Sequence, residues 1–138
     1  MEQKIFNFYF KDISIEDLIN PDKYSNSADV INIINCIENT MKVYANAITY
    51  TQFRNIYGIL QKSDTVAEIQ KARPKIAYIH ARLDGSTKHD GEIVLAKDLT
   101  FFIMEIIKNL INQNQIKPFH EFMETMVAFH KQYNTKNN

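Results

Sequence analysis

The chain has 138 residues and carries sixteen basic and sixteen acidic side chains, so its formal net charge is zero. This length suits a single domain, and the hydrophobic share of 45 % is enough to build one core. Three glycines and three prolines are too few for sandwiches, barrels or glycine-rich phosphate loops, and no apolar stretch is long enough to span a membrane. The single cysteine, Cys36, indicates a reducing cytoplasm.

The charges are unevenly distributed along the chain. Residues 1–40 hold three basic and seven acidic groups, a net charge of −4, whereas residues 42–88 hold eight basic and three acidic groups, a net charge of +5. A basic segment of this kind is either a solvated face or a surface that binds an anionic partner. Charge alone does not separate the two interpretations.

The first 26 residues have no clear helical period. The sequence IFNFYF is compatible with an extended conformation, and SIEDLIN with a short capped helix. We therefore expect an N-terminal extension over 1–26, partly extended or disordered, followed by a helical bundle domain over 27–138.

Hydrophobic spacing from residue 27 onward follows the helical period and predicts five main helices. Ser27 is the expected N-cap of the first, and Thr49 or Thr51 of the second. The third is expected over about 64–84, with Pro74 inside it as a kink or a new start. The remaining helices are expected over about 93–112 and 117–133, and the segment 85–91 between the third and fourth is a candidate for disorder. The predicted fold is a single-domain, all-α bundle of about five helices.

The fourth predicted helix is apolar on two sides. Its second patch consists of Phe101, Met104 and Ile111. A helix of this kind is either central to its bundle or packed against another subunit.

No catalytic or metal-binding constellation stands out. His120 and Glu124 lie four residues apart and make at most a two-ligand pair, which is a weak signal. His130 lies in an apolar stripe, and Cys36 has no histidine near it in the sequence, so both are expected to be core residues. We predict no metal, no cofactor and no enzymatic activity.

The third predicted helix carries a row of polar side chains. At 100° per residue, four residues fall within about 60° of one another and span about 16 Å along the axis; they are Lys71, Lys75, Tyr78 and Arg82. Cations around one aromatic ring suit a sugar-phosphate track. The alternative is that these side chains cover the edge of the core with no ligand.

Three segments, in this order and spacing, resemble the small helical subunit of type III-A CRISPR effector complexes, the Csm small-subunit family. They are ITYTQFRNIY (48–57), KARPKIAYIHAR (71–82) and FHEFMETMVAFHKQY (119–133). The capped helix start matches at Thr49, Thr51, Gln52, Phe53 and Arg54, and the Pro-Lys-hydrophobic-Ala-Tyr run at Pro74–Tyr78, followed by Arg82. In the last segment Thr125 and Phe129 depart from the family's usual alanine and tyrosine.

The resemblance implies a non-catalytic subunit of a ribonucleoprotein for antiviral defence. It would line the guide RNA–target RNA duplex, contact other subunits, and stack with copies of itself along a filament, with a homodimer available to the isolated chain. The expected RNA contacts are Arg54, Lys71, Lys75, Tyr78, Arg82 and Lys131. The alternatives are a protein–protein interaction module that docks through Phe101, Met104 and Ile111, and an enzyme built on His120 and Glu124.

Overall fold

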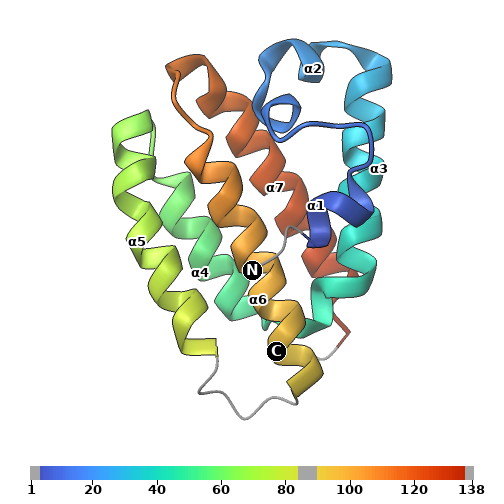
Figure 1. Cartoon of the computed structure of the whole chain (residues 1–138), viewed down its shortest axis with the longest axis vertical. Helices are drawn as coiled ribbons and strands as arrows, with labels where there is room; N and C mark the ends of the chain where they lie inside the picture. The colour runs from blue at the N-terminus through green and yellow to red at the C-terminus, as the bar shows by residue number, and fades with distance from the viewer. Residues whose placement is uncertain (1–3, 84–89, 136–138) are drawn as a thin grey trace.

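The computed structural model describes residues 4–83 and 90–135 (Figure 1). Within these ranges the chain forms seven α-helices and no strand, so the all-α prediction is confirmed and the count of five is too low. The helices are α1 (Lys4–Tyr9), α2 (Pro21–Ser25), α3 (Ser27–Tyr44), α4 (Tyr50–Gln61), α5 (Val66–Arg82), α6 (Asp90–Lys108) and α7 (Ile116–Tyr133). Three 3-10 turns are bounded entirely by described residues: η1 (Glu16–Ile19), η2 (Ala45–Ala47) and η4 (Gln113–Gln115).

The two helices not expected from the sequence, α1 and α2, both lie in the first 26 residues. The sequence IFNFYF was compatible with an extended conformation, but Lys4–Tyr9 forms a helix. The ring of Phe10 follows this helix and packs 5.3 Å from Phe102 and 6.3 Å from Phe122, centroid to centroid, so burial in the core fixes this segment. The division into an extension over 1–26 and a domain over 27–138 stays a prediction.

Side-chain caps fix where the helices begin. Asn26, rather than Ser27, caps α3 by accepting a hydrogen bond from the backbone N–H of Asp29. Thr49 caps α4 in a reciprocal capping box with Gln52, which confirms one of the two expected caps. The prediction of a helix start at Pro74 is wrong, because α5 continues through it as a single helix.

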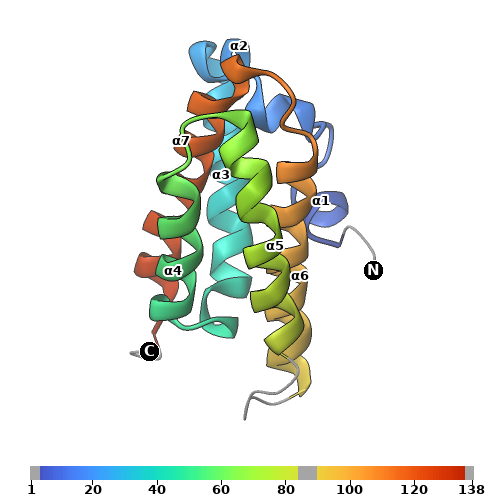
Figure 2. The ribbon, with the colours of Figure 1, turned by 90° about the vertical axis from the view of Figure 1, so that its left-hand side faces the viewer.

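The long helices pack as a bundle in which α4 lies between α5 and α7 (Figures 1 and 2). Helix α5 packs on α6, and α7 packs on both α3 and α4. Helices α4 and α5 run antiparallel and form one side of the molecule, which faces the viewer in Figure 2. The segment 85–91 was expected to be disordered; of it, residues 85–89 lie outside the described part of the chain, and Asp90 and Gly91 begin α6.

Helix α6 is central to the bundle. It contacts α5, α1 and α3, and its buried side chains include Leu99, Phe102, Ile103, Ile106 and Ile107. This arrangement explains why the sequence of α6 is apolar on two sides. Among the described residues, no helix has both the length and the apolar character needed to cross a bilayer.

Candidate nucleic-acid interface

The side of the molecule formed by α4 and α5 is rich in cations. The two helices together contain five basic residues and one acidic residue, Glu68. The apolar residues of both helices turn toward the core, which leaves the charged ones outside. All six side chains predicted to contact RNA are exposed: Arg54, Lys71, Lys75, Tyr78, Arg82 and Lys131.

The row predicted on α5 lies along one exposed face. Because the helix runs unbroken from Val66 to Arg82, Pro74 does not separate Lys71 from the later members of the row. Tyr78 is 63 % exposed, an unusual position for a large aromatic ring. The Arg82 guanidinium carbon lies 5.5 Å from the centre of that ring. The last two members of the row thus form a cation–aromatic pair.

Two further cations lie over the faces of neighbouring aromatic rings. Arg54 lies 5.4 Å from the ring centre of Tyr57, and the Lys131 ammonium lies 4.3 Å from that of Tyr50. A ring face attracts a cation without carrying a formal negative charge. Such a pair therefore orients the cation but leaves its full charge available to an anion.

Carboxylates do not neutralise these cations. Within residues 4–83 and 90–135, none of the five cations predicted to contact RNA lies within 4 Å of an acidic side chain. The ion pairs found there lie elsewhere, between Lys23 and Asp29 and between Lys108 and Glu105. Five exposed cations with no carboxylate partner in the described part of the chain are an arrangement that attracts polyanions.

The predicted residues do not all lie together. Lys71, Lys75, Tyr78 and Arg82 share α5, and Arg54 lies on the neighbouring α4. Lys131 belongs to α7, which packs on the side of α4 away from α5. Its ammonium group lies over the ring of Tyr50, the first residue of α4. A ligand that touches all six residues must therefore cross α4.

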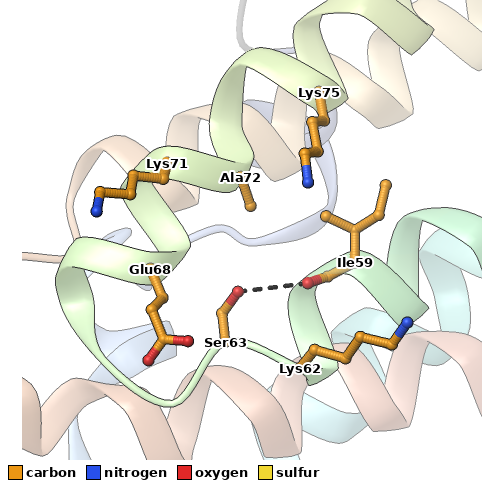
Figure 3. Close-up of a pocket in the computed structure, with 7 residues that line it drawn as sticks. All are labelled: Ile59, Lys62, Ser63, Glu68, Lys71, Ala72 and Lys75. Carbon is orange, nitrogen blue, oxygen red and sulfur yellow. Dashed lines mark hydrogen bonds between the residues drawn. The ribbon is translucent and has the colours of Figure 1, made fainter.

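A pocket of about 310 Å³ lies where α4 ends and α5 begins (Figure 3). Lys75 points into the space between the helices, while Lys71 and Lys62 line its rims. Lys62 was not among the residues singled out from the sequence. It follows the last residue of α4, outside the period of either helix, and only the turn geometry brings it beside the α5 row.

Hydrogen bonds from residues distant in the sequence hold the turn that forms this pocket. The Nε2 atom of His120 on α7 donates a hydrogen bond to the carbonyl oxygen of Ser63 at 2.9 Å. The Gln113 amide donates to the Asp64 carbonyl oxygen at 2.7 Å and accepts from the Val66 backbone N–H at 3.4 Å. These bonds join the turn to the far side of the bundle and fix its geometry.

Of the two residues considered for a metal site, His120 has a structural partner. The Nε2 atom of His120 is engaged in the hydrogen bond to Ser63, between α4 and α5. Glu124 lies four residues further along α7 and is exposed. Across the described ranges, no group of three or more His, Cys, Asp or Glu side chains is placed to hold a metal ion. Burial raises the pKa of the Cys36 thiol, so less of the reactive thiolate is present at neutral pH.

His130 is a core residue, as expected, but only one of its ring nitrogens is satisfied. It is fully buried and donates from Nε2 to the Ile48 carbonyl oxygen at 2.9 Å, with its ring 4.6 Å from Phe53. Within the described part of the chain, Nδ1 has no hydrogen-bond partner. Burial lowers the pKa of the imidazole, although the bond to Ile48 opposes this shift.

The alternative docking patch is largely occupied by the bundle itself. Met104 packs against the core and Phe101 is half-buried, whereas Ile111 lies beyond the end of α6 and is 73 % exposed. The other large apolar side chains that are exposed in the described part of the chain are Phe8, Ile31, Ile34, Val43, Tyr78 and Val94.

The chain is thus all-α and carries an exposed face that is rich in cations. A family model described as Csm2 Type III-A matches residues 25–136. Because this match covers most of the chain, the protein belongs to that family and is a small subunit of a type III-A CRISPR effector complex. No curated protein and no solved structure matches the chain.

Proposed function

We propose that the chain is a non-catalytic subunit that lines the guide RNA–target RNA duplex and contacts its sugar-phosphate backbone. The contacts are Arg54, Lys71, Lys75, Tyr78, Arg82 and Lys131. The observation that carries this proposal is the exposure of the five cations without a carboxylate within 4 Å of any of them in the described ranges. An exposed cation that lacks an intramolecular carboxylate gains most from a phosphate.

The mode of contact follows from the chemistry of these side chains. Lysine and arginine pair with phosphates of any sequence, so they position RNA without reading it, and base pairing with the guide supplies sequence specificity. Tyr78 offers a ring face next to Arg82 for a sugar or a base. Side chains that hold a strand in this way need no nucleophile or metal.

The proposal also includes where the protein works and what it contacts. It works in the cytoplasm beside other subunits of the effector complex and beside copies of itself stacked along the filament. A homodimer is available to the isolated chain.

The test reverses charge on α5 in the assembled complex. Lys75→Glu combined with Arg82→Glu should reduce the capture of target RNA at 150 mM salt by at least tenfold, about the loss expected for two phosphate contacts. A matched control, Lys11→Glu with Lys42→Glu, makes the same change in net charge in the N-terminal segment and on α3. Capture that falls equally in both variants, or in neither, contradicts the proposal.

A further inference from the structure

The pocket between α4 and α5 is small, and three lysines but only one acidic residue line it. At about 310 Å³ it is near the lower end of ligand-site volumes, which begin at about 300 Å³. Its lining includes the side chains of Lys62, Lys71 and Lys75 and one acidic residue, Glu68. The Lys75 ammonium points into the space, whereas those of Lys71 and Lys62 lie at its edges and point outward (Figure 3). The small side chain of Ala72 leaves the space open at its base (Figure 3).

The three lysines can converge on one anion. Lys71 and Lys75 are four residues apart on α5, so their Cβ atoms are about 5–6 Å apart on one face. Lys62 lies on the opposite rim (Figure 3). A lysine carries its charge on a flexible four-carbon stem, so rim residues can turn inward to an anion, at a cost in rotamer entropy.

The single carboxylate is already engaged. Glu68 accepts a hydrogen bond from the Thr65 hydroxyl at 3.1 Å, at the start of α5. It lies more than 4 Å from each of the three ammonium groups, within the described residues. The Ser63 hydroxyl donates to the Ile59 carbonyl oxygen, so the lysines are the charged donors left for a ligand.

We propose that this pocket seats one phosphate group, held by Lys62, Lys71 and Lys75. This inference rests on the proposed function where the phosphate belongs to RNA, and it adds Lys62 to the contacts. Because His120 and Gln113 hold the turn in place, the backbone that carries these lysines is fixed before the ligand arrives, and the rim lysines turn inward on binding. One fixed phosphate then sets where the strand begins its path along the α5 row.

The first test uses the isolated full chain and inorganic phosphate at constant ionic strength. Amide resonances of residues 59–75 should shift with phosphate and saturate. Lys62→Gln should weaken the apparent affinity by about fivefold, the effect of one exposed charge contact. Glu68→Gln, which keeps an oxygen for Thr65, should strengthen it. Lys11→Gln is the control of equal charge and should leave it unchanged.

The second test separates an RNA phosphate from a free one. In the assembled complex, Lys62→Gln should lower the capture of target RNA by a similar factor. Normal capture in Lys62→Gln, together with loss of capture in the Lys75 and Arg82 reversal, would overturn the RNA seat and leave the proposed function standing. If phosphate shifts no resonance in 59–75, or if Lys62→Gln and Lys11→Gln act alike, there is no seat.

Discussion

The Nε2 atom of His120 lies 2.9 Å from the carbonyl oxygen of Ser63, so helix α7 holds the turn that joins α4 to α5. Two residues 57 positions apart in the sequence thus fix the relative placement of the two cationic helices. The histidine first considered as half of a metal site has a structural role at the rear of the candidate interface.

Removing this bond should destabilise the fold measurably. His120→Ala leaves the carbonyl oxygen of the buried Ser63 without this donor, and we expect a loss of about 1–2 kcal/mol in the free energy of unfolding. Urea denaturation measures it. His120→Gln provides an amide donor of similar reach and should recover at least half of the loss; equal losses in both variants would show that the hydrogen bond is not the cause.

Stability should fall as the solution is acidified, because His130 is buried in its neutral form. Its pKa in the folded chain is lowered from the ordinary value of 6.5, so the unfolded chain binds a proton first as pH falls. The stabilisation is complete above pH 6.5 and is lost as pH falls through that value toward the folded pKa.

Thermal unfolding at pH 7.5 and pH 5.5 tests this. His130→Phe keeps a ring against Phe53 but does not titrate, so the Tm difference between the two pH values should be smaller in the variant. In that variant the Ile48 carbonyl oxygen still accepts from Asn134 at 3.3 Å. An equal Tm difference in both proteins would exclude His130 as the titrating group.

Gly58 occupies an interior position of α4 where a side chain would fit. A Cβ atom built there meets nothing within 4 Å. Because alanine has the higher helix propensity, Gly58→Ala should raise the free energy of unfolding by about 0.5–1 kcal/mol, measured by urea denaturation. Gly91→Ala, in the first turn of α6, meets equally open space but should gain less, because helix ends fray. Destabilisation by Gly58→Ala would contradict the description of this surface.

The sequence alone predicts the long helices well, because their apolar residues recur with the helical period and because side chains cap the first turns of α3, α4 and α5. It does not predict α1, whose aromatic residues read equally well as a strand. The choice there depends on tertiary contacts, above all those of Phe10 with Phe102 and Phe122. Such contacts join segments about a hundred residues apart and leave no local signal.

In the candidate interface too, some residues can be found from local periodicity, and others depend on tertiary contacts. Lys71, Lys75, Tyr78 and Arg82 share one helix, so periodicity alone finds their common face. Lys62 lies in a turn and Lys131 on another helix, so their places relative to that row depend on how helices pack. Periodicity within one element carries no information about that packing.

The dependence of RNA binding on salt tests the central claim most directly. Each phosphate contact releases counterions, so the slope of log K against log [salt] counts the contacts, at about 0.7–0.9 per phosphate. In the assembled complex, Lys75→Gln with Arg82→Gln should reduce the magnitude of this slope by about 1.4–1.8. The Lys11→Gln, Lys42→Gln control should leave it unchanged. An unchanged slope in the α5 variant would contradict the claim that the cations of this helix hold the RNA backbone.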